Sequence, residues 1–350
     1  MRLNSKNNFF ENEEWVDQKN IFWSSPAERL DVFAKQRLRL VGGFLQSFFE
    51  PQHDSFLWKI PLRYTFLVLL IILILLSGCS AAKGNQAISG DFNRIVSTAP
   101  SNTEIIVDLK QAHRLVAIDK HSANVFGIPD DLPLLDFFFP DLEVIINLQP
   151  DLILASGHNP TGSGEDPFRL LREIGIPVVY ISMSKSINDI YKDITLIAQL
   201  LQAGLEGEAL IASMKEQISQ IAAQTTADGE NMQTVYFEIS AAPQMMSFGK
   251  DSFINDMISV IGAQNIFENE NWLVTPGAET IINRNPDVIL TNVNYIEDPI
   301  NEIKSRPGFT HINAVKNNRV YLIDNDSSSR PSSRVVLALR QMSEAVSSRN

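Results

Sequence analysis

Short apolar runs alternate with amphipathic stretches along most of the chain after residue 91, and this alternation predicts an α/β protein. Most runs are apolar at successive positions, which is typical of parallel strands that helices cover on both faces. Seven such strands are predicted, at Arg94–Thr98, Leu115–Ile118, Leu152–Ala155, Val178–Ser182, Val235–Ile239, Val288–Thr291 and Val320–Ile323.

The strand rhythm stops between residues 186 and 224, where the spacing is helical throughout. A capping box formed by Ser186 and Asp189 opens this segment. Gly204 and Gly207 interrupt it and predict a kink. Apolar residues recur every three or four positions, at Ile187, Ile190, Ile194, Ile197 and Leu201.

One phrase occurs twice in the chain. LEVIINLQPDLILAS, residues 142–156, returns as AETIINRNPDVILTN, residues 278–292, with Glu, Ile-Ile-Asn, Pro-Asp and Ile-Leu in matching places. Each copy predicts a short helix, a stop before Pro-Asp and a buried strand. We therefore expect two similar Rossmann-like lobes with mostly parallel sheets, at 92–183 and 227–350, joined by a long connecting helix within 184–226.

A second pair of segments supports the same duplication. Residues 101–112 resemble residues 252–263, so each lobe is expected to carry a capped helix at this point. In the first lobe the Ser101 hydroxyl is predicted to cap a helix that ends near Leu109, with Glu104 at the capping-box position.

Composition and charge narrow the possible functions. With 44% hydrophobic and 20% charged residues among 350, the chain is an ordinary folded protein rather than a disordered one. Its formal net charge of −12 argues against a nucleic-acid partner, because a phosphate backbone would be repelled.

A targeting segment is predicted at residues 57–79. Basic Lys59 and Arg63 precede an unbroken apolar run, 66–76, which is shorter than the roughly 20 residues that a membrane span needs. The following Leu-Ser-Gly-Cys resembles the lipobox of bacterial lipoproteins, in which the cysteine is acylated, for example with palmitate, and becomes the first mature residue. Cys79 is the only cysteine, so an intramolecular disulfide is excluded. The alternative is an ordinary cysteine after a retained membrane helix.

Residues 1–56 precede the predicted signal peptide, although such a peptide normally begins near the N-terminus. Two explanations stay open: a start codon assigned too far upstream, or a cytoplasmic extension with the apolar segment kept as an anchor. Residues 80–91 form a polar linker to the first lobe.

Several motifs resemble one family. RIVSTAPSNTEII from Arg94, the phrase at 142–156, SFGKDSFINDMISVIGAQNIF from Ser247 and SSRPSSRVVLALRQM from Ser328 are similar to the substrate-binding proteins of ABC importers for vitamin B12, iron-siderophores and haem. The resemblance implies a monomeric, lipid-anchored protein on the extracytoplasmic face of the cell membrane. It implies a metal-chelate ligand, an ABC permease as partner, no catalysis, and no cofactor or metal of its own.

The resemblance also implies which residues act. The ligand would lie between the lobes, on loops after the strands, against Ser101, Asn102, His121, Phe137, Met246, Phe248, Trp272 and Arg330. His121 and Met246 stand where the vitamin B12 binders carry aromatic rings, a departure that haem and iron chelates tolerate. Glu143 and Glu279 match the two glutamates with which the family contacts the transmembrane subunits.

Other functions stay open as alternatives. A zinc or manganese importer component would share the lipobox and the two lobes, but it needs clustered ligands, and the histidines after Cys79 lie far apart in sequence. A surface lipoprotein without a transport role is a further alternative. An enzyme is not expected, because neither G-x-S-x-G nor H-E-x-x-H occurs.

Replacing Cys79 by Ala tests the lipid anchor. Because the acyl chains would be the only stable attachment after cleavage, the variant is expected to lose processing or to move from the membrane pellet to the soluble fraction. Fractionation and immunoblotting of cells measure both. A cleaved variant that stays in the pellet would contradict the lipobox prediction.

Overall fold

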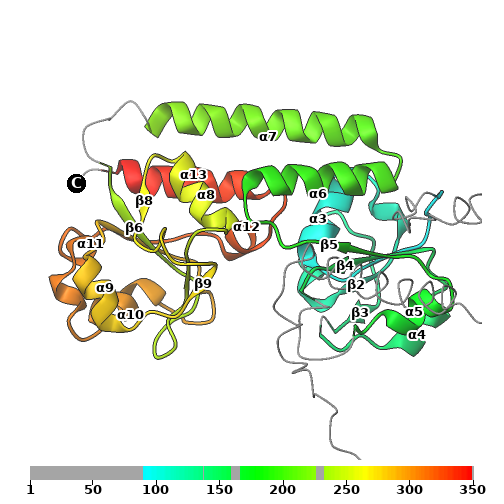
Figure 1. Cartoon of the computed structure of the whole chain (residues 1–350), viewed down its shortest axis with the longest axis horizontal. Helices are drawn as coiled ribbons and strands as arrows, with labels where there is room; N and C mark the ends of the chain where they lie inside the picture. The colour runs from blue at the N-terminus through cyan, green and yellow to red at the C-terminus, as the bar shows by residue number, and fades with distance from the viewer. Residues whose placement is uncertain (1–89, 137, 159–165, 226–231, 349–350) are drawn as a thin grey trace, which may run out of the picture. The chain divides into compact units, whose positions relative to one another are not determined.

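The structure is a computed structural model that describes residues 90–136, 138–158, 166–225 and 232–348. In the first lobe, five parallel strands pair in the order β3-β2-β1-β4-β5 (Figure 1). The elements of this lobe are β1 (Ile95–Ser97), α3 (Pro100–Asp108), β2 (Leu115–Asp119), β3 (Leu134–Leu135), α4 (Leu142–Asn147), β4 (Leu152–Ser156), α5 (Arg169–Glu173) and β5 (Val178–Ile181), with 3-10 turns η2 (Ala112–Arg114) and η3 (Lys120–Ser122).

In the second lobe, four parallel strands pair in the order β11-β10-β6-β8, and an antiparallel pair, β7-β9, lies beside them. Its elements are β6 (Thr234–Glu238), β7 (Ser247–Phe248), α8 (Phe253–Val260), β8 (Gln264–Asn265), β9 (Leu273–Val274), α9 (Ala278–Arg284), β10 (Val288–Thr291), α10 (Pro299–Ser305), η6 (Phe309–His311), α11 (Asn313–Lys316), β11 (Val320–Leu322), α12 (Asn325–Ser329) and α13 (Val335–Ser347).

The two copies of the repeated phrase occupy equivalent places in the two sheets. The first copy forms α4 and β4, and β4 lies between β1 and β5; the second forms α9 and β10, and β10 lies between β6 and β11. Within the described residues, the second sheet repeats the strand order of the first without a counterpart of β3. The predicted fold class, two similar α/β lobes with parallel sheets, is confirmed.

Alternate residues of the central strands β1, β4, β6 and β10 enter different cores. Ile95 of β1 and Val235 of β6 both belong to one large core, which the two lobes share with the helices between them. Their neighbours Val96 and Tyr236 instead belong to two smaller cores, one on the far face of each sheet. This two-residue period gives each sheet one face toward the shared core.

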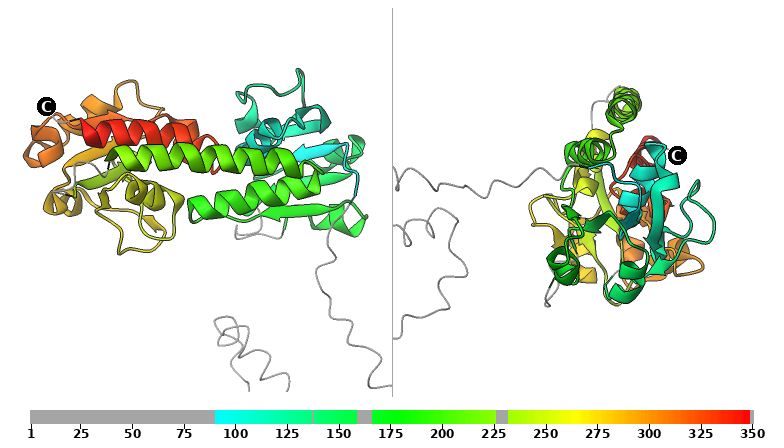
Figure 2. Two further views of the ribbon diagram at one scale, coloured as in Figure 1. Left: turned by 90° about the horizontal axis from the view of Figure 1, so that it is seen from above. Right: turned by 90° about the vertical axis from the view of Figure 1, so that its right-hand side faces the viewer.

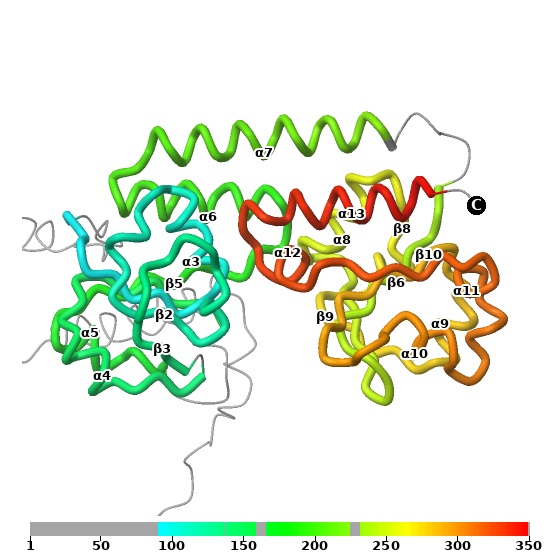
Figure 3. Tube along the Cα trace, turned by 180° about the vertical axis from the view of Figure 1, so that it is seen from behind, coloured from blue at the N-terminus to red at the C-terminus, as the bar shows by residue number. Residues whose placement is uncertain are grey.

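Two helices connect the lobes. In α6 (Ile187–Leu200) the residues at helical spacing, among them Ile190 and Ile194, are fully buried. The 22-residue α7 (Gly204–Thr225) contacts both α6 and α13. Figure 2 and Figure 3 show α7 lying along these two helices, so it spans both lobes. No helix of the described residues combines the length and the hydrophobicity that a membrane crossing needs.

Two local expectations were wrong. The segment is two separate helices rather than one kinked helix, since α6 ends at Leu200 and α7 begins at Gly204. Gly207 lies where the two helices touch, and a Cβ at this position would be 2.6 Å from the Cβ of Ala198. The Ser101 hydroxyl does not cap α3 either. That helix begins at Pro100, whose fixed φ suits the first turn.

Gly249 permits a close backbone approach. A Cβ there would lie 2.2 Å from the carbonyl oxygen of Glu270, a backbone atom that cannot rotate away, while the Gly249 N–H donates to the carbonyl of Trp272 at 2.7 Å. We predict that Gly249→Ala lowers the free energy of unfolding by roughly 1–3 kcal/mol because of this overlap. Urea denaturation measures the loss. Gly204→Ala is the control, since nothing lies within 4 Å of its Cβ position; equal stability of the two variants would contradict the prediction.

Candidate ligand-binding cleft

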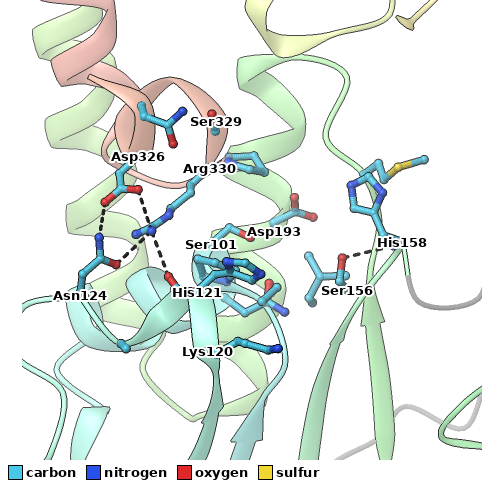
Figure 4. A pocket seen from close by; sticks show the side chains of 18 of the residues that line it. Ser101, Lys120, His121, Asn124, Ser156, His158, Asp193, Asp326, Ser329 and Arg330 are labelled. Carbon is cyan, nitrogen blue, oxygen red and sulfur yellow. Dashed lines mark hydrogen bonds and ion pairs between the residues drawn. The ribbon is translucent and has the colours of Figure 1, made fainter. Parts of the chain in front are cut away.

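A cavity of about 620 Å³ lies between the two lobes, within the size range of small-molecule sites. The loops that follow β1, β2, β4 and β5 line it from the first lobe, and those after β10 and β11 line it from the second. Figure 4 shows side chains of these loops converging on the cavity. Because all these strands are parallel within their sheets, their carboxyl ends bring six loops together.

Four of the predicted ligand-binding residues line this cavity, namely Ser101, Asn102, His121 and Arg330. Ser101 lies in the first turn of α3. Asn102 is buried, and its amide donates to the carbonyl of Leu154 at 3.4 Å, which fixes α3 against β4. His121 is exposed in η3, where its backbone N–H donates to Asp119 at 2.8 Å.

Arg330 crosses from the second lobe to the first. Its guanidinium donates to Glu104 at 2.9 Å and, through the other terminal nitrogen, to the His121 carbonyl at 3.0 Å and to Asn124 at 3.0 Å. Asp326, in the preceding helix turn, lies 2.7 Å from the same nitrogen and accepts from the Asn124 amide (Figure 4). Arg330 is therefore already surrounded by protein acceptors.

Glu104 is the buried centre of this contact, with 1% of its surface exposed. Burial raises the pKa of its carboxyl, and hydrogen bonds from Ser332, at 2.5 Å, and from Arg330 oppose that rise. Ser333 also donates to Asp108 of the same helix. Three hydrogen-bonded residues after α12 thus hold α3.

Asp193 brings a carboxyl from the connecting helix α6 into the cavity. Burial raises its pKa to about 6, and the negative charge of Asp189 adds to the effect. The hydroxyl of Ser184, which donates to Asp193 at 2.7 Å, and the charge of Lys192 both oppose the rise. This carboxyl therefore changes its charge near neutral pH.

Three other predicted residues lie in the second lobe but not among those that line the cavity, namely Met246, Phe248 and Trp272. Phe248 and Trp272 pack edge to face, with ring centroids 5.2 Å apart. Phe137 and Cys79 lie outside the described residues. Phe138 and Phe139, which follow Phe137 in the chain, are exposed.

Glu143 and Glu279 lie outside the cavity, on the surface. Each is exposed in the first turn of its helix, α4 or α9, as the repeated phrase predicts. Asp141 caps α4 by accepting from the Glu143 N–H at 3.0 Å, whereas Gly277 stands at the cap of α9. The two carboxylates occupy equivalent positions in the two lobes.

A model of the periplasmic binding proteins matches residues 95–327. The chain belongs to this family. Periplasmic binding proteins are not enzymes, which agrees with the expectation from the sequence. Among the described residues, no group of three or more His, Cys, Asp or Glu side chains is placed to hold a metal ion.

Several known proteins are similar to this chain over most of their own length. The chain is 29% identical to the uncharacterized ABC transporter substrate-binding lipoprotein YvrC of Bacillus subtilis, over 76% of this chain and 83% of that protein. It is 25% identical to the vitamin B12-binding protein of Vibrio campbellii, over 73% and 90%. The crystal structure of a possible iron-binding, periplasmic solute-binding protein from Staphylococcus epidermidis superposes with a TM-score of 0.67 at 30% identity, covering 74% of this chain and all of that one.

Other cavity residues of this periplasmic binding protein were not predicted from its sequence, namely Lys120, Asn124, His158, Asp193, Asn294 and Asn325. Lys120, His158 and Asn294 all follow the ends of predicted strands, so the sequence could have indicated that they lie near the cavity. The sequence gave no such indication for Asp193, which is one of several polar residues on α6. Only the three-dimensional structure shows which side of this helix faces the cleft.

The raised pKa of Asp193 gives a pH dependence with a defined sign. The folded protein binds the Asp193 proton more tightly than the unfolded chain does, so the free energy of unfolding falls as pH rises from 3.8 to about 6. An asparagine carries no charge at any pH, so it avoids the cost of burying the Asp193 carboxylate. We therefore predict that Asp193→Asn is more stable than the unsubstituted protein at pH values above about 6. Melting temperatures measured between about pH 4 and about pH 8 give the difference.

Asp189→Asn on the same helix is the control. The Lys192 ammonium holds the pKa of Asp189 below its ordinary value, so this carboxylate stabilises the fold at neutral pH and its replacement is expected to lower the melting temperature there. If the melting temperatures of the two variants changed with pH in the same way, the raised pKa of Asp193 would be contradicted.

Proposed function

We propose that this periplasmic binding protein is the substrate-binding component of an ABC importer. It captures a metal chelate, such as an iron-siderophore, cobalamin or haem, between its lobes and delivers it to the permease. Its lobes correspond to residues 92–183 and 227–350, the connector to 184–226, and the lipid on Cys79 holds the monomer at the extracytoplasmic face of the cell membrane.

The cavity between the lobes carries this proposal. Loops from both sheets line it, and its volume suits one small ligand. The names of similar proteins support the chelate class, since the Vibrio relative is a vitamin B12-binding protein and the Staphylococcus structure is described as possibly iron-binding. YvrC is named a lipoprotein, which supports the anchor at Cys79.

The paired glutamates support delivery to a two-fold symmetric permease. Glu143 and Glu279 are exposed on equivalent helices of two similar lobes, so each lobe can offer one carboxylate to one transmembrane subunit. A first-turn carboxylate also stabilises its helix by about 0.3–1 kcal/mol through the helix dipole. A docking role is therefore tested by transport, and the helix role by stability.

We predict that Glu143→Arg combined with Glu279→Arg abolishes uptake, because cationic groups on the permease would then face like charges at both lobes. Ligand affinity should stay within about twofold, since neither residue lines the cavity. Accumulation by cells is measured with ferric citrate, haemin and cyanocobalamin supplied in turn, and affinity is measured on the purified full chain.

The control is Glu208→Arg combined with Glu297→Arg, which reverses the same number of exposed carboxylates elsewhere on the surface. This control should transport normally. Normal uptake by the Glu143 and Glu279 double variant, or equal losses in both double variants, would show that the repeated glutamates only stabilise their helices.

A further inference from the structure

Exposed apolar side chains flank Glu143 on the first lobe. Phe138 and Phe139, which precede α4, are 66% and 85% exposed, and Val144 and Ile146 within α4 are exposed as well. Ile146 is three positions after Glu143, so the two side chains lie on the same side of the helix. Together these four apolar residues form the α4 patch.

Hydrogen bonds hold the backbone of the two phenylalanines next to the cavity. The Asp136 carboxylate accepts from the N–H groups of Phe138 and Phe139, at 2.9 Å each. The same carboxylate pairs at 2.6 Å with Lys120, which lines the cavity. Because this backbone is already held, less conformational freedom is lost when a partner covers the rings.

The repeated phrase shows which residues stand at the equivalent positions beside Glu279. Thr275 takes the place of Phe139, and Thr280 takes the place of Val144. Both threonines are exposed, so the surface around Glu279 is polar where the surface around its counterpart is apolar.

The two remaining counterparts are apolar but covered. Val274 takes the place of Phe138, and Ile282 takes the place of Ile146. Both are half-buried and pack against the small core of the second lobe. Ile282 also lies against Gly308, where a Cβ would be 2.7 Å from its Cδ1. The duplicated helices therefore carry the same glutamate in two different surroundings.

The charges beside the α4 patch indicate which partner covers it. Asp141 and Glu143 are exposed carboxylates in the same segment, and the formal net charge of the chain is −12. This charge disfavours an anionic lipid surface, and also a second copy that presents the same acidic face. A protein surface with apolar side chains around a basic group complements both the patch and Glu143.

We infer that the α4 patch is the apolar part of the permease-docking surface, so that the first lobe supplies most of the docking affinity. This inference rests on the proposed function and assigns further residues to the same contact. The partner is an extracytoplasmic loop of one transmembrane subunit, with apolar residues beside a cationic group. The rings exclude water around the ion pair of Glu143, which strengthens it, whereas the pair of Glu279 stays in contact with solvent.

The test measures uptake by cells that make the full chain from an inducible promoter, with ferric citrate, haemin and cyanocobalamin supplied in turn. Phe138→Ser combined with Phe139→Ser is expected to raise roughly tenfold the amount of binding protein needed for half-maximal uptake, as loss of an aromatic anchor does at protein interfaces. Immunoblotting measures that amount. Uptake should recover at high expression, because mass action offsets a weaker contact.

The matched control is Leu205→Ser combined with Met232→Ser. These side chains are 80% and 68% exposed, close to the values of the two rings. Leu205 belongs to α7, which borders the shared core, whereas α4 packs on the core at the far face of the first sheet (Figure 1). Uptake by this control should match that of the unsubstituted protein. Equal losses in the two double variants would overturn the inference.

Single charge removals test the difference between the lobes. Glu143→Gln is expected to raise the half-maximal amount more than Glu279→Gln does, because only the first carboxylate has apolar neighbours that exclude water. When Phe138→Ser and Phe139→Ser are also present, this difference should disappear, since neighbouring residues of one contact are coupled. Equal effects of the two single variants in the unsubstituted protein would overturn the inference.

Measurements on the purified full chain identify the other possible occupants, each of which would overturn the inference. Dimerisation that the Phe138 and Phe139 variant abolishes would assign the patch to a second copy. Quenching of the fluorescence gained by Phe139→Trp in vesicles of brominated phospholipid would assign it to the lipid surface. A roughly tenfold loss of affinity for the transported probe in the Phe138 and Phe139 variant would assign the rings to the ligand site.

The remaining outcomes separate this inference from the proposed function. Full uptake by the Phe138 and Phe139 variant, together with loss of uptake when Glu143 and Glu279 are both replaced by Arg, overturns the α4 patch and leaves an importer component that docks through its glutamates. Uptake of none of the three probes by the unsubstituted protein overturns both.

Discussion

The contact between Glu104 and Arg330 determines how the two lobes meet beside the cleft. A carboxylate with 1% exposure needs compensation, and it receives this from Arg330 and Ser332, both of which follow α12 in the other lobe. Removing one partner of a buried ion pair typically costs about 3–5 kcal/mol, because the other charge stays buried without compensation. The helix α3 is thereby held to the second lobe in addition to the connecting helices α6 and α7.

This contact also sets the chemistry of the cleft. Arg330 lines the cavity, and acceptors from its own chain surround its guanidinium. Asp193 adds a carboxyl whose charge depends on pH near neutrality, since burial raises its pKa to about 6. The charged contact between the lobes and the Asp193 carboxyl thus share one cavity.

Local sequence patterns predicted the elements well and the tertiary contacts poorly. The helical spacing of α6, the Ser186 cap and the Ser252 cap were all correct, because these features depend on residues close in sequence. Glu104 was assigned to a helix cap, yet it is buried against residues more than 220 positions away, which no local pattern reveals. In α4 Ile145 is buried, whereas its neighbour Val144 is 37% exposed.

The duplication has one further consequence, visible when Glu104 is compared with its counterpart. Asn255 occupies the equivalent position in the second lobe, and its side chain stays within that lobe, accepting from the Asn265 amide at 3.0 Å. The surface helices α4 and α9 have kept the same glutamate, whereas α3 and α8 have diverged. The repeat is therefore preserved at these two surface helices and lost at the two helices that face the interior. The asymmetry of these contacts therefore lies in α3 and α8, not in the helices that carry the repeated glutamates.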